Sequence, residues 1–312
     1  MKPFPSVLRF ALLCGVSLPL WFRPLAQTFW LASGDEKYTD ILLILPLAAV
    51  LIVQGFRERK FELQSWAPAA GLLAMALLVW GTVRWTNLFG GSDIGLTFSM
   101  ASLVLWWIAS FVLCFGIPAW RSMRFPLLFL FWVVPIPALA MDRIVAALAQ
   151  GSTLSAEGLF AIFGPIARHG NTLYLPGLEL DVAAECSSIR SSLMLLVSTI
   201  LLAHLFLRAP WRKWLLIVLA SLLSVAKNGL RIFMIGMLST RVDSSFLHGR
   251  LHREGGIVFF SIALLGVMLL LWILRRGEAR AGSSPTSGAK GRTEKETFAE
   301  TPRALARGER EV

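Results

Sequence analysis

Cysteine, histidine and charged side chains are all scarce in this sequence of 312 residues. There are three Cys and four His, and only 16% of the residues are charged. Two of the cysteines, Cys14 and Cys114, lie inside apolar runs, so neither a disulfide framework nor a C-x-x-C metal site is available. No H-E-x-x-H zinc motif occurs either. The few reactive side chains that lie outside apolar runs are therefore informative about function.

Apolar residues are abundant, at 56% of the chain. They occur in blocks close to the roughly 20 residues that a helix needs to cross a ~30 Å hydrocarbon core. This pattern predicts an all-α polytopic membrane protein with about eight transmembrane helices. The predicted spans are 9–31, which Arg23 and Pro24 interrupt, and then 40–56, 67–83, 96–117, 125–141, 187–207, 214–238 and 257–274.

The net charge of +11 is explained by membrane topology better than by nucleic-acid binding. Basic residues cluster in the loops on one side of the spans, which the positive-inside rule assigns to the cytoplasm. These residues are Lys2, Arg9, Arg57, Arg59, Lys60, Arg121, Arg124, Arg208, Arg212 and Lys213. The sequence therefore predicts a multi-pass protein of the cytoplasmic (inner) membrane. Both termini are expected in the cytoplasm and the segment 142–185 outside, with the lipid bilayer and no nucleic acid as a partner.

The outer segment before the sixth span shows two different patterns. Its first part, 142–164, has apolar residues at helical spacing and predicts a small helix in the membrane interface. Its second part, "NTLYLPGLELDV", alternates around Pro176 and Gly177 and predicts a β-hairpin. At the other end of the chain, residues 277–312 are rich in Ser, Gly, Thr, Lys, Arg and Glu. They predict a disordered basic cytoplasmic tail after a transmembrane domain of residues 1–276.

Cys186 stands at the start of the sixth span, where helix N–H groups and nearby cations lower a thiol pKa and favour the nucleophilic thiolate. Arg231 lies about 17 residues beyond Trp214, so at 1.5 Å per residue it is roughly 26 Å along the seventh span, near the outer face. Asn228 precedes it by three residues and shares its helical face. Two interpretations of Arg231 remain at this point: a side chain that reaches the outer headgroups, or part of a site.

Histidine completes the set of reactive side chains. His248 and His252 precede the last span on the outer side, whereas His204 lies toward the cytoplasmic end of the sixth. A histidine can take the thiol proton and return it to a leaving amine, and an arginine can stabilise an oxyanion. The combination predicts acyl transfer from a peptide bond, with no cofactor and no metal. Zinc held by the cysteine and both histidines is the rival interpretation, which a nearby guanidinium opposes.

Two charged neighbours of the cysteine have alternative roles. Arg190 follows Cys186 by four residues and is expected on the same helical face, where it binds either a substrate carboxylate or lipid headgroups. Glu185 either pairs with Arg190, orients the histidine, or complements the helix dipole.

These residues occur in segments that resemble the exosortase/archaeosortase family of membrane-embedded cysteine transpeptidases. The similar segments are "YTDILLILPLAAVLI", "RFPLLFLFWVVPIP", "LYLPGLELDV", "ECSSIRSS", "NGLRI" and "HREGGIVFF". The resemblance implies Cys186 as nucleophile, Arg231 in an N-x-x-R motif, and His252 in an H-x-x-x-G motif that ends at Gly256. The sequence departs from the usual cysteine motif in having Glu185 in place of Ala and Ser188 in place of Gly.

The resemblance further implies a substrate class and a role. The expected substrates are exported, membrane-anchored proteins with a C-terminal sorting signal, and the expected role is protein sorting, with a link to exopolysaccharide production. A polytopic transporter and a non-catalytic assembly factor for exopolysaccharide export are the alternatives. A transporter is expected to carry ionisable residues near the bilayer midplane, whereas here they gather at one face.

Overall fold

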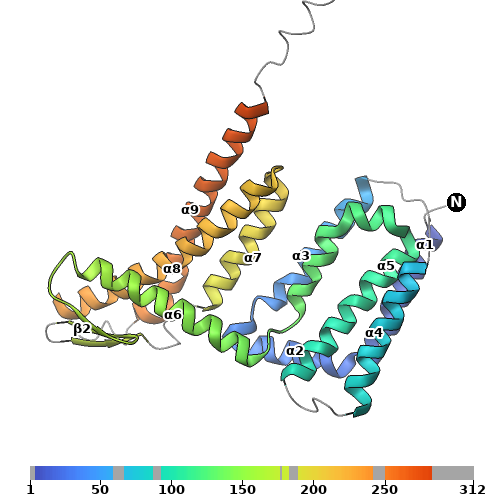
Figure 1. Ribbon diagram of the computed structural model, residues 1–312, viewed down its shortest axis with the longest axis horizontal. Helices are drawn as coiled ribbons and strands as arrows, with labels where there is room; N and C mark the ends of the chain where they lie inside the picture. Colours follow the sequence, from blue (N-terminus) through green and yellow to red (C-terminus); the bar gives the residue numbers. More distant parts are fainter. Residues whose placement is uncertain are drawn as a thin grey trace, which may run out of the picture.

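The computed structural model describes residues 4–58, 67–86, 93–175, 178–182, 189–241 and 250–282. They form helices and one small antiparallel sheet (Figure 1), which confirms the predicted all-α membrane fold. The elements are α1 (Phe4–Leu20), α2 (Phe22–Gly34), the 3₁₀ helix η1 (Glu36–Tyr38), α3 (Ile41–Glu58), α4 (Ala67–Thr86), α5 (Asp93–Phe129), the 3₁₀ helix η2 (Leu130–Val133), α6 (Ala138–Phe160), β1 (Ala167–His169), β2 (Thr172–Leu175), β3 (Leu178–Asp181), α7 (Ile189–Phe206), α8 (Pro210–Arg241) and α9 (Arg250–Gly282).

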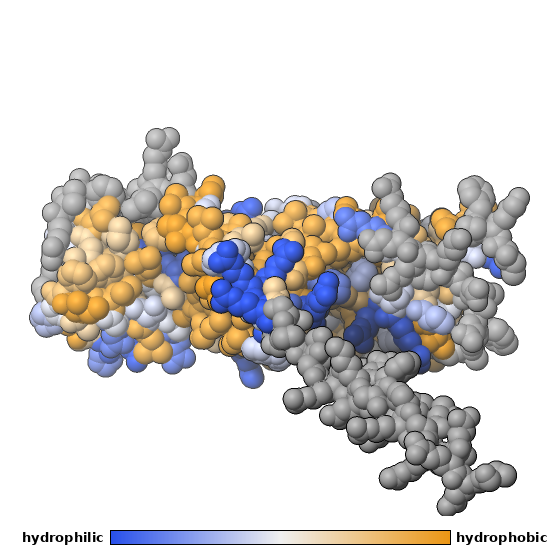
Figure 2. Space-filling model, turned by 90° about the horizontal axis from the view of Figure 1, so that it is seen from above, coloured by the Kyte–Doolittle hydropathy of each residue, from blue (hydrophilic) through white to orange (hydrophobic). Residues whose placement is uncertain are grey.

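The surface of the molecule is apolar along the helices. Large side chains such as Leu78, Leu222 and Leu265 are 68%, 62% and 69% exposed, and Figure 2 shows apolar residues over much of the visible face. Within the described residues, five helical stretches are long and apolar enough to cross a bilayer: α3 with η1, α5 with η2, α7, α8 and α9. The bent pair of α1 and α2 makes a sixth if it counts as one span.

The first predicted span, 9–31, is not one straight helix. It divides into α1 and α2, which meet at Trp21 with a bend of 78°. Pro24 in the first turn of α2 has no N–H to donate to the carbonyl of Leu20, so the α-helical hydrogen-bond ladder is interrupted at this point. The Trp21 side chain fills the bend: it is fully buried, and its Nε1 donates to Ser102 Oγ at 2.9 Å.

Helix α5 contains two arms rather than one rod. A straight helix of its 37 residues would be about 55 Å long, nearly twice the hydrocarbon thickness. The backbone leaves helical geometry at Gly116 (φ 81°) and Met123 (φ −109°), and Figure 1 shows the ribbon turning back there, with the second arm beside α3. The two arms correspond to the predicted spans 96–117 and 125–141, although the second differs in where it ends. The positive φ at Gly116 is a backbone conformation that glycine adopts without steric cost.

The second arm ends earlier than predicted. The predicted span reached Met141, whereas α5 ends at Phe129 and η2 at Val133. Val134 is extended, and Pro137 caps the start of α6. Pro135 and Pro137 lack the N–H groups that continuing the helix requires, so they end the arm. The apolar described part of α4 is also short, at 69–82. The count of eight spans therefore remains a prediction.

Buried apolar residues form three clusters. The largest joins α1–α5 with η2 and the first turns of α6 and α7, around residues such as Trp21, Met100 and Phe111. The second holds α7, α8 and α9 together through Leu195, Leu216 and Val267. The third lies under the sheet. Figure 1 shows α1–α5 on one side of the molecule and α7–α9 on the other, with α6 running from between them toward the sheet.

The segment before α7 contains a helix and a β-hairpin, as predicted. The helix, α6, begins at Ala138, four residues earlier than predicted, because Pro137 provides its start. Strands β2 and β3 pair antiparallel with Leu173 opposite Leu180, and both side chains are buried against the end of α6 and α8. Strand β1, which was not predicted, pairs with β2 through a turn at Gly170, whose φ is 62°.

The C-terminal part of α9 is hydrogen-bonded to the turn between α7 and α8 and to the first turn of α8. The Glu278 carboxylate accepts from the backbone N–H groups of Arg208 and Ala209 at 2.8–3.2 Å. Arg212 Nη1 donates to the carbonyl of Leu274 at 2.9 Å. The bonds to Glu278 satisfy N–H groups just before the start of α8. Helix α9 reaches Gly282, six residues into the predicted tail, and the rest of that tail lies outside the described residues.

Candidate functional site

A group of polar side chains lies where α6, α7 and α8 meet, and it includes the two buried basic residues of the described part of the chain, Lys227 and Arg231. All members of the group except Ser191 are at most 9% exposed. We call this group the polar seam; it consists of Ser152 on α6, Ser191 and Ser192 on α7, and Ser224, Lys227, Asn228 and Arg231 on α8. Because an unsatisfied polar group inside a membrane protein costs several kcal/mol, such a group needs internal partners.

Hydrogen bonds across the polar seam fix how α7 and α8 lie against each other. Ser224 Oγ donates to Ser192 Oγ at 2.9 Å, and Lys227 Nζ donates to Ser191 Oγ. Moving from Ser224 to Lys227 along α8 therefore means moving back toward the start of α7. Arg231 lies one further turn along α8 on the same helical face. Arg231 therefore lies beyond Lys227 in the direction of Ile189, where α7 begins.

The seam is strongly positive. Lys227 is 5% exposed, and Arg231, one turn away, is 9% exposed. The ion pairs that described residues form with one another are Lys37–Asp142, Arg168–Glu157 and Arg190–Glu36. Within this part of the chain, the Lys227 ammonium contacts the neutral hydroxyl of Ser191. Two cations in a partly dehydrated site stabilise negative charge that develops beside them. The site is suited to a thiolate or an oxyanion.

Asn228 anchors the seam to α6. Its side chain is 1% exposed, and its Nδ2 donates to Ser152 Oγ at 2.9 Å. The next residue, Gly229, has no side chain, which allows the backbones to approach closely: a Cβ there would lie 2.4 Å from Ser155 Cβ and Oγ, and 3.1 Å from the backbone N of Ala156. Small residues at helix contacts permit this kind of packing in membrane proteins. The N-G-L-R motif thus has a packing function as well as carrying Arg231.

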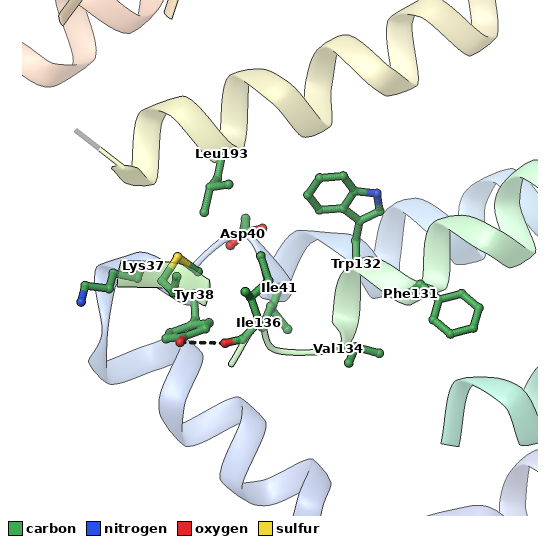
Figure 3. Close-up of a pocket in the computed structure, with 10 residues that line it drawn as sticks. Lys37, Tyr38, Asp40, Ile41, Phe131, Trp132, Val134, Ile136 and Leu193 are labelled. Atoms are coloured by element: carbon green, nitrogen blue, oxygen red, sulfur yellow. Dashed lines mark hydrogen bonds between the residues drawn. The ribbon is translucent and has the colours of Figure 1, made fainter. Parts of the chain in front are cut away.

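A cavity of about 180 Å³ lies beside the first turns of α7 (Figure 3). We call it the η1–α7 cavity. It is lined by residues of η1, the start of α3, the segment around η2 and α7, among them Tyr38, Asp40, Trp132, Ile136 and Leu193. Tyr38 Oη donates to the carbonyl of Ile136 at 3.0 Å and so joins two of these segments.

The structure places some of the predicted site residues and not others. Cys186, Glu185 and His248 lie outside the described residues. His252 falls in the first turn of α9, with its side chain outside the described part. That helix begins at Arg250, seven residues before the predicted span, whereas its apolar part that could cross a membrane begins at Gly256, one residue before the predicted start at 257.

Among the predicted residues that are described, only Arg231 and Asn228 belong to the polar seam. Arg190 lies outside it: its side chain is half exposed, and its Nη1 is 4.0 Å from Glu36 Oε1 at the edge of the η1–α7 cavity. His204 is far along α7 from the seam, where its ring stacks on Phe125 with centroids 3.6 Å apart.

Comparison with known protein families identifies the chain. A family model described as transmembrane exosortase matches residues 6–269. The chain belongs to the transmembrane exosortase family. The matched range runs from α1 to most of α9 and includes the polar seam and the η1–α7 cavity. No curated protein and no solved structure gives a significant match.

Membership of the exosortase family supports a general role as a membrane transpeptidase in protein sorting. It confirms the family resemblance found in the sequence. It also favours sorting over transport, since the matched region is nearly the whole membrane part of this exosortase.

Sequence reasoning missed several residues of the seam. Lys227 adjoins the N-x-x-R motif and is one helical turn before Arg231, yet it was not selected as a candidate. The signal was available, because a lysine within a predicted span is costly unless it faces a polar site. Ser152, Ser191, Ser192 and Ser224 carry no such signal, since serine is common at helix contacts in membranes. Their role became visible only from the packing of α6, α7 and α8.

Proposed function

We propose that this exosortase is a cysteine endopeptidase and transpeptidase. It cleaves the C-terminal sorting signal of exported, membrane-anchored proteins at the outer face of the cytoplasmic membrane, with both of its own termini in the cytoplasm. The observation that carries the proposal is the position of Arg231. It is buried in the polar seam, one helical turn beyond Lys227, which donates to Ser191 in the first turn of α7, and Cys186 precedes α7 by three residues in the sequence.

The proposed reaction begins at the thiol of Cys186. Its thiolate attacks the carbonyl carbon of the scissile peptide bond and forms a C–S bond, which gives a tetrahedral oxyanion. Arg231 stabilises that oxyanion with its planar guanidinium donors. The C–N bond then breaks, and His252 gives the leaving amine the proton that it took from the thiol. The acyl group stays on sulfur as a thioester, and the substrate's C-terminal helix is released.

The decisive variant is Cys186→Ala, which we expect to leave full-length precursor in the membrane. Cys186→Ser should be nearly as poor, because a hydroxyl is much harder to ionise than a thiol. Arg231→Lys should fail as well, since a point charge does not reproduce the guanidinium fork. Precursor processing is followed on immunoblots of a tagged substrate, and Cys14→Ala, which changes a thiol in α1, serves as the matched control. Normal processing by Cys186→Ala would disprove the mechanism.

The assignment of the histidine is tested separately. We propose His252 over His248 because it stands in the H-x-x-x-G motif and, in the structure, within the first turn of α9. His252→Ala should abolish processing while His248→Ala retains most of it. The reverse result would assign the proton transfer to His248 and leave the rest of the mechanism in place.

A further inference from the structure

We propose that the η1–α7 cavity binds the primary ammonium group of an acceptor that takes over the acyl chain at the end of the reaction. This inference rests on the proposed function, because it names the nucleophile that resolves the thioester. It is carried by a buried carboxylate, an aromatic wall and the position of the cavity beside the start of α7.

Asp40 supplies the negative charge. It lines the cavity and is only 8% exposed. Among the described residues, no basic side chain lies within ion-pair distance of its carboxylate, which instead faces the backbone N–H groups of Asp40 itself and Ile41 at the start of α3. Burying a carboxylate without a counter-ion is costly. A cationic ligand group would remove that cost. The N–H groups at the start of α3 offset only part of it.

Lys37 does not neutralise Asp40. It also lines the cavity, but Figure 3 shows its side chain extending away from the space beneath Leu193. Its Nζ lies 3.3 Å from Asp142 Oδ1 instead. The one basic side chain among the cavity's lining residues is therefore engaged elsewhere, and the charge inside the cavity remains that of Asp40.

Aromatic side chains complete the environment that a cation prefers. Trp132 and Tyr38 line the cavity, and Figure 3 shows Trp132 and Asp40 both directed toward α7. The face of an indole attracts an ammonium group when the two are within about 6 Å. Apart from Lys37, the remaining lining residues are apolar, namely Ile41, Phe131, Val134, Ile136, Met141 and Leu193. A carboxylate, an indole and an apolar wall together favour an alkylammonium over a hydroxyl compound or an anion.

A neighbouring cavity has the same sign of charge. This second cavity, of about 190 Å³, shares Lys37, Tyr38 and Ile136 with the first and is also lined by Asp35, Asp93 and Asp142. Three further carboxylates against one lysine make this neighbourhood net negative, which raises the local concentration of cations. These acidic residues attract cations to the region, whereas the buried carboxylate that would bind the ammonium group is Asp40 in the first cavity.

The location relates the cavity to the reaction. Leu193 in the second turn of α7 forms part of its wall, and Arg190 in the first turn approaches Glu36 of η1. In the proposed transfer, the bound ammonium loses one proton to water. The free amine then attacks the thioester carbonyl, a C–N bond forms, the C–S bond breaks, and a second amine proton passes to the departing thiolate. The products are an amide and the regenerated thiol.

The test uses Asp40→Asn in the full-length enzyme, reconstituted with a tagged substrate. Asparagine caps a helix about as well as aspartate, so this change removes the charge and preserves the start of α3. Asp181→Asn removes an exposed carboxylate of β3 that lines neither cavity, and it is the matched control. The probe is dansylcadaverine, a soluble primary amine, and mass spectrometry measures the ratio of amine adduct to hydrolysed acid in the product.

We expect Asp40→Asn to lower the ratio of adduct to acid at least tenfold while the rate of precursor cleavage changes less than twofold. Asp181→Asn should change both less than twofold. An unchanged ratio in Asp40→Asn, or hydrolysed acid as the sole product of the unaltered enzyme in every arm, would overturn the proposal. Normal precursor cleavage by Cys186→Ala would instead overturn the proposed function, so the two failures are distinguishable.

Two vesicle compositions distinguish the source of the amine. One set contains phosphatidylethanolamine, whose headgroup carries a primary amine, and the other contains phosphatidylcholine, which carries none. A lipid adduct that forms in the first set and depends on Asp40 supports a headgroup acceptor. A dansylcadaverine adduct that forms in the second set and depends on Asp40 supports a soluble amine. Adducts that form in either set equally well without Asp40 would contradict the assignment of the cavity.

Discussion

Replacing Gly229 by alanine tests whether close packing of α6 on α8 holds Arg231 in place. The added Cβ would lie 2.4 Å from both Cβ and Oγ of Ser155 and 3.1 Å from the backbone N of Ala156. Carbon atoms in contact are normally about 3.5–4.0 Å apart. The Ser155 side chain cannot rotate away from the contact entirely, because its Cβ is fixed to the backbone. We therefore expect the two helices to separate by roughly 1 Å at this point.

The magnitude follows from two opposing effects. Alanine is favoured over glycine inside a helix by about 1 kcal/mol, which alone would stabilise the variant. Overpacking costs about 1–3 kcal/mol, and the upper part of that range applies because the contact involves backbone as well as side chain. The net expectation is a loss of about 2 kcal/mol, close to a 30-fold change in the folding equilibrium.

The assay is equilibrium unfolding of the purified protein in detergent micelles, together with precursor processing in cells. Gly158→Ala is the matched control: it lies in α6, and a Cβ there would meet nothing within 4 Å, so it should gain about 1 kcal/mol. The double variant Gly229→Ala/Ser155→Gly should recover part of the lost stability and processing. Equal stability of Gly229→Ala and Gly158→Ala would refute this account of the α6–α8 contact.

Two further predictions concern charge. Lys227→Met removes a buried cation and its bond to Ser191, so we expect the pH at which half of Cys186 reacts with iodoacetamide to rise. Lys227→Arg should bring that pH most of the way back. An unchanged pH profile for Lys227→Met would show that the charge of Lys227 does not influence the thiol. The charge distribution predicts that a reporter fused after Lys60 or at Val312 reads cytoplasmic and one within 142–185 reads external, and an external reading at Val312 would overturn the topology.

Much of the fold could be predicted because hydropathy and turn residues act locally. The hairpin at β2 and β3 was predicted from alternation around Pro176 and Gly177, and the structure confirms it. The starts of α7 and α8 also lie close to their predicted positions. The predicted end of a span was wrong where a proline ends the helix several residues before the apolar run itself ends. Hydropathy continues through Pro135, for example, although the hydrogen-bond ladder does not.

The candidate site was predicted less completely, for a different physical reason. Arg231 stands out in a sequence because a guanidinium in an apolar run is costly. The partners that make it tolerable are small and neutral, and they lie on three helices that are distant in the chain. Ser152 is 76 residues from Asn228, and Ser191 is 36 residues from Lys227. One sequence contains no signal for such pairings. The η1–α7 cavity is likewise assembled from segments that are distant in the chain. Two of them, "YTDILLILPLAAVLI" and "RFPLLFLFWVVPIP", carry the family resemblance, but neither indicates that the two meet.

The contacts of α8 suggest why helix packing, rather than hydropathy alone, sets the depth of Arg231. Apolar helices slide along the bilayer normal at a cost of only fractions of a kcal/mol per ångström, which is too little to fix a reacting group. In this molecule α8 is held by Asn228 and Gly229 against α6, by Lys227 against α7, and by the Glu278 carboxylate that accepts from the N–H groups just before its first turn. A slip of one residue along α8 would break all of these contacts together. Since an oxyanion must meet its donors within about 3 Å, a peptide bond that emerges at one depth requires this kind of restraint.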